Sequence, residues 1–325
     1  MKLPRRKFLH LAAGAASIPV VTRISRADTY PSHPVHLIVG FGAGSGSDIT
    51  ARLIGQWLSE RLGQPFIVEN RPGAGGNVGA DAVVHAPPDG YTLLLVVAAY
   101  ALNATLYDKL NFNFIHDIAP VASLVRTPQV MAVNPSVPAK TVSEFIAYAK
   151  ANPGKISMAT DGIGSVQHIS GELFMTMTGV DLTPVHYRGD PAALNDLVGG
   201  QVQVMFDILP PSLGFIRAGK LRALGVTTAT RLGVLPDVAP IGDFVPGYLA
   251  GGWLGVGAPK RTPIEIVDKL NNTINAGLAD PALKARLADF GSIILAGSPA
   301  EFGKLIADET EKWGKVIRAA NIKAE

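Results

Sequence analysis

The sequence contains no cysteine, and only 17% of its 325 residues are charged. Without thiols the chain cannot form disulfides, thiolate zinc sites or iron–sulfur clusters, and it has neither a cysteine nucleophile nor a cysteine that carries a lipid. Its hydrophobic share of 47% is that of a globular protein, and its length suffices for two cores of roughly 100 to 200 residues each. Two lobes are therefore expected.

Long apolar runs are also missing from most of the chain. Beyond residue 27, no uncharged run free of proline and glycine reaches the roughly 18 residues expected of a transmembrane helix. At the N-terminus, Arg5 and Arg6 precede a shorter apolar segment at 8–21, which small residues follow up to Ala27. We predict a twin-arginine-type signal peptide over 1–27, cleaved near Ala27, and a periplasmic location. A basic arm before a membrane anchor is the alternative.

Removal of this segment changes the sign of the net charge. The whole chain carries 29 basic and 26 acidic residues, a formal charge of +3. The segment holds six basic residues and no acidic one, which leaves 23 basic against 26 acidic residues, a formal charge of −3. The six are Lys2, Arg5, Arg6, Lys7, Arg23 and Arg26. No nucleic-acid partner is therefore expected for the mature protein.

Strands alternate with helices along both halves of the chain. The first half has strand-like segments at 35–41, 65–68 and 91–97, with a helical spacing of apolar residues at 48–62. After Pro138, strands are expected at 156–159, 182–187 and 201–207, and helices at 142–151, 169–177 and 190–200. This order predicts an α/β protein with mostly parallel sheets that helices cover on both faces.

The tail after Pro263 is mostly helical and has too little strand to form a third domain. It is expected to fold back on the first lobe, so that the chain crosses between lobes twice, near 127–134 and near 248–257. The predicted lobes are 28–128 plus 250–325, and 129–249. A ligand cleft is expected between them.

The first strand leads into a glycine-rich loop at 42–47. A dinucleotide fingerprint needs glycine at positions i, i+2 and i+5, but Ser45 or Ser47 stands where the third glycine should be. Glu69 ends the next strand, where such folds hold the ribose, so an NAD(P)-dependent oxidoreductase stays open as the alternative function. A purely structural tight turn is also possible.

The loop ends at the start of a helix, where backbone N–H groups without internal partners attract anions. Candidate ligand contacts are Ala43, Gly44, Ser45, Gly46, Ser47 and Asp48. The two serines add hydroxyl donors, and Ser47 is also a candidate N-cap. Asp48 either complements the helix dipole or favours an amino-bearing ligand.

The second lobe repeats this feature where Gly162, Gly164 and Ser165 open the helix that carries His168. Two such helix starts, one in each lobe, could grip a dicarboxylate from opposite sides without an arginine clamp. His168 is either a partly buried residue that packs or caps, or a contact of the ligand.

Three further residues follow predicted strands. Tyr100 could pack on the carbon chain of the ligand, Arg188 could lie at the cleft or in solvent, and Asp207 could line the pocket or hold a loop.

Catalytic and metal motifs are missing. No serine has glycine both two residues before and two residues after it, so a nucleophile elbow is absent. Of the seven histidines only His33 and His36 are close in sequence, and Pro34 separates them, which makes a poor zinc site. We expect no enzyme activity, no metal and no cofactor.

Long motifs along nearly the whole mature chain resemble those of the extracytoplasmic solute receptors of tripartite tricarboxylate transporters, the Bug receptors. They are the first loop with Gly46, Asp48 and Arg52, then "ENRPGAGGNVGA", "PPDGYTLL", "DIAPVASLV", "NPGKISMATDGIGSVQH", "VHYRGDPAALNDLVGGQVQVMFD" and "LGVGAPKRTP". The resemblance implies a type II, Venus flytrap-like periplasmic binding fold. It also implies a small mono-, di- or tricarboxylate ligand, held by the loops at 42–48 and 162–168, and delivery to membrane transport subunits.

The chain departs from this family at two positions near the expected site. The first loop commonly reads Pro-Gly-Gly before a small polar residue, where this chain has Gly44-Ser45-Gly46-Ser47, and Pro-Tyr-Lys-Gly commonly stands where it has 186–189. We expect a monomeric receptor. A binding protein that acts as a signalling sensor and not as a transport receptor is a further alternative.

Overall fold

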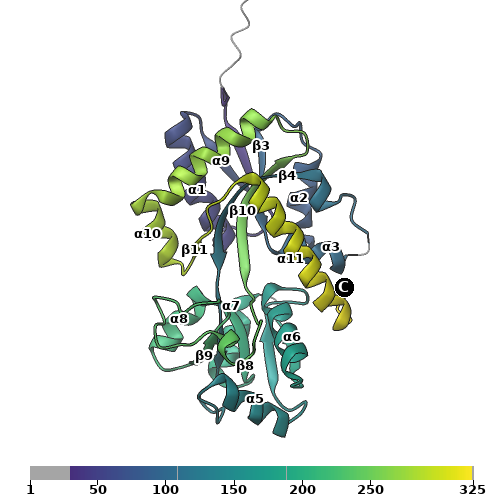
Figure 1. The fold of residues 1–325 in the computed structure, drawn as a ribbon, viewed down its shortest axis with the longest axis vertical. Helices are drawn as coiled ribbons and strands as arrows, with labels where there is room; N and C mark the ends of the chain where they lie inside the picture. Colours follow the sequence, from purple (N-terminus) through teal and green to yellow (C-terminus); the bar gives the residue numbers. More distant parts are fainter. Residues whose placement is uncertain (1–29, 108, 188, 324–325) are drawn as a thin grey trace, which may run out of the picture.

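The computed structural model describes residues 30–107, 109–187 and 189–323. The predicted signal peptide and Arg188 lie outside these residues. Two mixed sheets, each covered by helices, form an upper and a lower lobe (Figure 1). The predicted two-lobed α/β fold is confirmed, but the described sheets are not mostly parallel as predicted. Two of five strand pairings in the first sheet and two of four in the second are parallel, because the strands next to the crossovers run antiparallel to their neighbours. Within the described ranges, no helix combines the length and the apolar character that crossing a membrane requires.

The first sheet has six strands in the order β11-β4-β10-β3-β1-β2. Strand β1 is parallel to β2 and β3, whereas β10 is antiparallel to β3 and β4, and β11 is antiparallel to β4. The strands are β1 (Val35–Val39), β2 (Phe66–Asn70), β3 (Thr92–Val97), β4 (Ile118–Thr127), β10 (Gly252–Pro259) and β11 (Ile293–Ile294). The helical elements that accompany this sheet are α1 (Gly46–Leu62), η1 (Ala74–Gly76), α2 (Asn77–Val84), α3 (Ala99–Leu106), α4 (Phe114–Asp117), α9 (Ile264–Ala279), α10 (Pro281–Asp289) and α11 (Pro299–Ala319).

The second sheet has five strands in the order β7-β6-β8-β5-β9. Strand β6 is parallel to β7 and β8, and β5 is antiparallel to β8 and β9. The strands are β5 (Gln129–Val133), β6 (Ser157–Thr160), β7 (Thr183–His186), β8 (Val204–Ile208) and β9 (Arg222–Val226). The helical elements of this lobe are α5 (Val142–Ala151), α6 (Val166–Thr178), α7 (Asp190–Gly199), α8 (Leu209–Arg217) and η2 (Ile241–Asp243).

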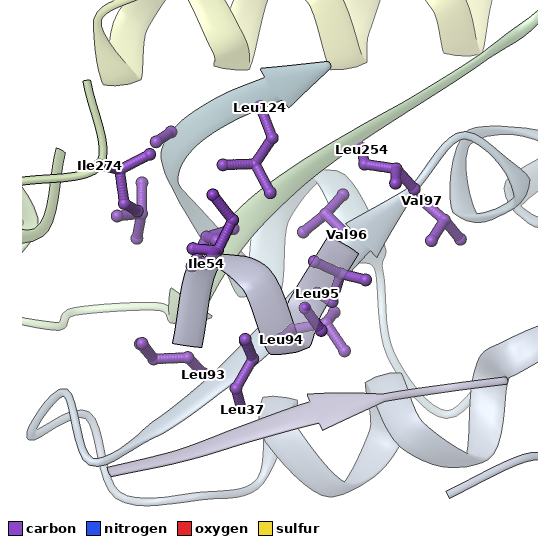
Figure 2. Packing of buried hydrophobic residues seen from close by; sticks show 14 of the residues in the cluster. Leu37, Ile54, Leu93, Leu94, Leu95, Val96, Val97, Leu124, Leu254 and Ile274 are labelled. Atoms are coloured by element: carbon purple, nitrogen blue, oxygen red, sulfur yellow. The ribbon is translucent and has the colours of Figure 1, made fainter. Parts of the chain in front are cut away.

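The core of the upper lobe forms because its central strand is apolar on both faces. Five of the six residues of β3 are buried, as expected for a strand that helices cover on both sides. Ile54 of α1 and Ile274 of α9 belong to the same cluster as Leu94 of β3 (Figure 2).

The chain crosses between the sheets at two places. Strand β4 ends at Thr127 and β5 begins at Gln129, so the first crossover is a single residue. The return runs between β9 of the second sheet and β10 of the first, and Gly252 at the start of β10 lies opposite Thr127. The two crossovers therefore lie side by side.

The last helix, α11, joins both lobes, whereas the tail was expected to fold back on the first lobe alone. Phe302 and Ile306 lie in the core of the upper lobe. Trp313 and Ile317 belong to a cluster that contains Phe174 of α6 in the lower lobe. Figure 1 shows this helix, in yellow, descending from the upper lobe beside α6. Besides the two crossovers, α11 thus connects the two lobes on one side of the molecule.

Candidate functional site

The first glycine-rich loop is built around a capped helix start. Gly44 has a φ of +81°, a conformation that residues with a side chain rarely adopt. The N-cap of α1 is Ser45, whose Oγ accepts a hydrogen bond from the amide of Asp48 at 3.2 Å. Ser47, the predicted N-cap candidate, instead lies inside the helix, 2.9 Å from Ser45 through their hydroxyl oxygens.

Asp48 holds this loop together with its carboxylate. Its Oδ2 accepts from the amide of Gly44 at 2.9 Å and from Nε of Arg52 at 3.0 Å, and its Oδ1 accepts from Asn70 at 3.0 Å. Burial acts to raise the pKa of Asp48, but the hydrogen bonds from Arg52, Gly44 and Asn70 outweigh it and lower the pKa. With a residue exposure of 2%, the carboxylate is a structural part of the loop.

The second loop has the same construction. Gly164 has a φ of +73°, Ser165 caps α6, and the amide of His168 donates to the Ser165 Oγ at 3.1 Å. In both loops the serine amide donates to the carbonyl of the glycine three residues earlier, Gly42 or Gly162, at 3.3 Å. The two loops therefore share one backbone conformation and one hydrogen-bond pattern.

His168 takes the role in this loop that Asp48 has in the first. Its Nδ1 accepts from the amide of Gly164 at 3.1 Å, which leaves Nε2 to donate to Glu172 at 3.2 Å. The ring is 4% exposed and packs edge-on against His186, with ring centroids 4.7 Å apart. His168 thus supports the loop from beneath it.

Each helix start leaves two amides without a partner. In the first loop they belong to Gly46 and Ser47, and in the second to Val166 and Gln167; none of these four donates to another described residue. They are the first two positions of helices of 17 and 13 residues, where the positive end of the helix dipole lies. Such amides can hold the oxygens of an anion.

In the upper lobe, the strand register directs the first loop toward the lower lobe. Val97, at the C-terminal end of β3, lies opposite Leu254 near the start of β10 and hence close to the crossovers. Strand β1 is parallel to β3, so its C-terminal end points to the same edge. The 42–48 loop follows β1 at that edge.

In the lower lobe, the register directs the second loop toward the upper lobe. Gln129 begins β5 directly after the first crossover and lies opposite Ile208 at the C-terminal end of β8. Because β6 is parallel to β8, the loop that follows β6 leaves the sheet at the same edge. The lobes already meet here: a Cβ atom at Gly164 would lie 2.5 Å from Cδ1 of Leu106 in α3.

Three carboxyl groups lie at this edge of the lower sheet. Asp207 is the next-to-last residue of β8, Asp161 follows β6, and Asp190 begins α7 after β7. Asp207 is fully buried and accepts a hydrogen bond from Ser212. Burial first, and then the neighbouring Asp190 and Asp161, raise the pKa of Asp207 well above its ordinary value. Burial and the charge of Asp190 likewise raise the pKa of Asp161.

Sequence reasoning selected Asp207 but missed Asp161 and Asp190. Both follow predicted strands directly or closely, which was the signal that could have identified them. Gln167 was also missed, because nothing in a helical sequence pattern distinguishes a buried glutamine from an exposed one.

The structure corrects the prediction for Tyr100. Its ring is 1% exposed, packs against Phe114 and belongs to the core of the upper lobe, so it offers no surface to a ligand. Its hydroxyl donates to the carbonyl of Gly76 at 3.3 Å. Arg188, also predicted at the site, lies outside the described residues.

The contacts of Glu69 do not favour a dinucleotide, and the placement of the described histidine and acidic side chains does not favour a metal. Glu69, the candidate ribose ligand, pairs with His36 at 2.5 Å and with Arg71 at 2.9 Å. Hydrogen bonds from Arg71 first and from His36 lower its pKa despite partial burial. In the part of the chain that the structure describes, no three histidine or acidic side chains are grouped so that they could hold a metal ion.

A family model and several relatives match most of this chain. The family model described as "Tripartite tricarboxylate transporter family receptor" matches residues 50–322. Protein BugT of Bordetella pertussis is 35% identical over 300 residues, which cover 91% of this chain and 92% of BugT.

Solved structures of two relatives with bound carboxylates are similar to this chain. Rpa4515 of R. palustris with adipate is 38% identical, with a TM-score of 0.81 over 90% of this chain and 99% of that one. MatC from Rhodopseudomonas palustris with bound malate is 33% identical, with a TM-score of 0.77 over 89% of this chain and 100% of that one.

Proposed function

Because the chain belongs to the tripartite tricarboxylate transporter receptor family, we propose that it is a periplasmic receptor that captures a small carboxylate between its two lobes. The ligands named for two similar structures, adipate and malate, are both carboxylates. The family consists of solute receptors, and the chain acts without catalysis.

One observation carries the proposal: two identically built helix starts, one in each lobe, leave unpartnered amides at facing sheet edges. Four amide hydrogen bonds to carboxylate oxygens contribute roughly 1.5 to 3 kcal/mol each. Their sum, roughly 6 to 12 kcal/mol before the costs of ordering and desolvation, is of the same order as the roughly 8 kcal/mol of a micromolar complex.

The proposed ligand contacts are the loops and not their buried supports. Ala43, Gly44, Ser45, Gly46 and Ser47 present the upper site, and Gly162, Gly164 and Ser165 present the lower one. Asp48 and His168 shape these loops, and Asp207 lies behind the lower one. Hinge closure of lobe 28–128 plus 250–325 onto lobe 129–249 would bring the two sites onto one ligand.

The proposal extends to cellular context. Residues 1–27 are removed as a twin-arginine-type signal peptide, and the loaded monomer delivers its carboxylate to the membrane subunits of a tripartite transporter. Pulse labelling of an Arg5→Lys, Arg6→Lys precursor tests the export route, and retained cleavage and export in that variant would contradict it.

Ligand identity and class are tested on gently purified residues 28–325. Native mass spectrometry should detect a co-purified small acid, and a thermal-shift panel of mono- and dicarboxylates should raise the melting temperature. A panel in which no carboxylate stabilises the protein, while a reduced nicotinamide dinucleotide does, would reject the proposal.

The role of the amides is tested by substitutions that remove the backbone N–H group. Gly46→Pro and Val166→Pro each place proline at the first helical position, which tolerates it. The preceding Ser45 and Ser165 already have the extended ψ values, 160° and 159°, that a following proline requires. Each variant should weaken carboxylate binding about 10-fold, since a hydrogen bond to a charged group is worth about 1.5 kcal/mol or more.

The matched controls keep the N–H group. Gly46→Ala adds a methyl group that meets nothing within 4 Å, and it should bind as the parent does. Val166→Ala controls for the lost side chain in the lower lobe. Unchanged affinity in both proline variants would exclude these amides as ligand contacts.

A further inference from the structure

Helix α11 carries two sets of buried side chains that lie in different cores. Phe302 and Ile306, in its first half, belong to the core of the upper lobe. Trp313 and Ile317, in its second half, belong to a cluster that includes Phe206 of β8 and therefore reaches the lower sheet. None of these four side chains of α11 is more than 4% exposed. Each half of the helix is thus anchored as a core element, and the two anchors lie in different lobes.

Helix α3 of the upper lobe divides its side chains in the same way. Tyr100 and Ala101 lie in the upper core, whereas Leu102 and Leu106 lie in the cluster that reaches the lower sheet. Leu102 and Leu106 are four residues apart, so they share one face of the helix, and they are 1% and 6% exposed. One face of α3 therefore belongs to a core that both lobes share.

A third helix, α6, completes this contact from the lower lobe. Helix α11 packs against both α3 and α6, and Figure 1 shows the three helices on one side of the molecule. Ile169 and Phe174 of α6 lie in the shared cluster. Just before α6, a Cβ atom at Gly164 would lie 2.5 Å from Leu106. We name this contact the interlobe seam and define it by Leu102, Leu106, Ile169, Phe174, Trp313 and Ile317.

On the opposite side of the crossovers, the described residues of the two lobes share no such core. Figure 1 shows α8 and α10 on that side. Gly291, after α10, approaches Leu209 at the start of α8, where an added Cβ atom would lie 3.3 Å from Cδ2. The buried cluster that contains Leu209 draws only on residues 130–235 of the lower lobe. Phe290 and Ile293, on either side of Gly291, remain 41% and 37% exposed. The deep apolar contact between the lobes is therefore one-sided.

We infer that the interlobe seam stays closed when no ligand is bound, and that it serves with the crossovers as a pivot of the hinge motion. Separating the three helices would expose their buried apolar side chains to water, and the cost of this exposure grows with the apolar area. A large hydrophobic interface restricts the relative movement of two lobes. The first crossover, a single residue between β4 and β5, is a covalent joint without such packing.

Two fixed points define the axis of the movement that remains. One is the pair of crossovers, where Gly252 lies opposite Thr127, and the other is the interlobe seam. Both sheets extend from the crossover strands, β4 and β5, past the strands that carry the ligand loops to an edge strand, β2 in the upper sheet and β7 in the lower. Rotation about this axis moves the edge strands farthest, whereas the loop at 162–168 stays close to α3. The site therefore opens at the end where β2 and β7 lie.

The absence of cysteine allows this movement to be measured with introduced spin labels. The seam pair, Thr176→Cys with Lys315→Cys, places nitroxides on exposed positions of α6 and α11. The far pair, Ile67→Cys with Asn195→Cys, places them on exposed positions of β2 and α7. In the ligand-free protein, pulsed electron resonance should give one narrow distance distribution for the seam pair and a broader one for the far pair.

Added ligand should close only the far end of the site. Adipate or malate should shorten the distance of the far pair and leave that of the seam pair unchanged. A second, longer population of the seam pair in the ligand-free protein would overturn the inference. So would a bound acid that moves the seam pair as much as the far pair, or that moves neither. The inference rests on the proposed function only for the added acids. If no carboxylate binds, the proposed function fails, while the ligand-free seam distance still decides the inference.

Two isoleucines of α11 provide matched variants. Ile317, in the seam, and Ile306, in the upper core, are 1% and 4% exposed, and substitution by alanine removes the same atoms from each. In the ligand-free protein, Ile317→Ala should broaden the distance distribution of the seam pair. It should also weaken binding of the acid roughly 3-fold or more, because the ligand must then restore the closed seam. Ile306→Ala should leave both unchanged.

Urea denaturation shows whether the two variants lose comparable stability. Equal broadening in both variants, or broadening in neither, would contradict a pivot at the seam. If Ile317→Ala does not fold, the seam distance measured in the parent protein decides the inference alone.

Discussion

Asp48 and His168 occupy the same position in two copies of one loop: the side chain of each accepts a hydrogen bond from the amide of the glycine four residues before it. One is a carboxylate and the other an imidazole, so the chemistry differs while the backbone geometry is kept. Each side chain fixes a left-handed glycine and, with the serine cap, directs two helix amides outward. The loops therefore depend on buried supports that need no contact with ligand.

The first prediction concerns the left-handed glycines. Gly44→Ala should cost about 1 kcal/mol in stability because an alanine at a φ of +81° is strained. Gly164→Ala should cost more, since its methyl group would also meet Leu106 at 2.5 Å. Gly42→Ala is the control, because it has open space and no left-handed backbone. Urea denaturation measures all three, and equal losses at Gly42 and Gly44 would argue against the strain.

The second prediction concerns Asp48. Asp48→Asn keeps an acceptor for the Gly44 amide but loses the charge that pairs with Arg52 at 2.9 Å, so the free energy of unfolding should fall by about 1 to 3 kcal/mol. The control is Asp308→Asn, which breaks an exposed pair with Lys304 of the same i,i+4 spacing and should cost about 0.5 kcal/mol or less.

The contribution of Asp48 to stability also depends on pH. Because folding lowers the pKa of Asp48, its contribution is complete above the ordinary value of 3.8 and is lost as the pH falls below that value. The stability difference between the parent and Asp48→Asn should therefore shrink in acid. A difference that stays constant from pH 7 to pH 3 would show that the ion pair is not the cause.

The third prediction separates hydrogen bonding from packing at His168. His168→Asn places an amide oxygen near the position of Nδ1 and should keep the Gly164 amide satisfied, whereas His168→Ala leaves that buried amide without an acceptor. Thermal unfolding should show a loss of about 1 to 3 kcal/mol for His168→Ala and a smaller one for His168→Asn. Carboxylate affinity should follow the same order, and the reverse order would contradict a supporting role.

The fourth prediction concerns Asp207. Folding raises its pKa, so its protonated form is favoured and stability should fall as the pH rises above the ordinary value of 3.8 through the raised one. Asp207→Asn keeps an acceptor for Ser212 and removes the charge, so it should raise the melting temperature at pH 8. The control Asp237→Asn, which changes an exposed carboxylate of the same lobe, should leave both the melting temperature and its dependence on pH unchanged. A variant less stable than the parent at pH 8 would show that Asp207 is charged and paired.

Much of the fold was accessible from sequence because it depends on local patterns. The alternation of apolar strands with 3.6-periodic helices predicted two α/β lobes, and the structure confirms both sheets and both crossovers. The family was recognised from its motifs as well. The predicted lobe boundaries and the signal peptide remain predictions. The path of α11 was not predicted, since its apolar stripe does not indicate which partner will cover it.

For the site, residues 42–48 and 162–168 by themselves determined two capped, glycine-started helices, because φ preferences and N-capping act over a few neighbouring residues. Only the tertiary structure decided which side chains support those loops and which face a ligand. It buried Tyr100 in the core and made Asp48 a structural part of its loop. It also brought Asp207 of β8 close to Asp161, which follows β6, and to Asp190 at the start of α7. Such neighbours come from strand order and register, which long-range packing sets and no local stretch of sequence contains.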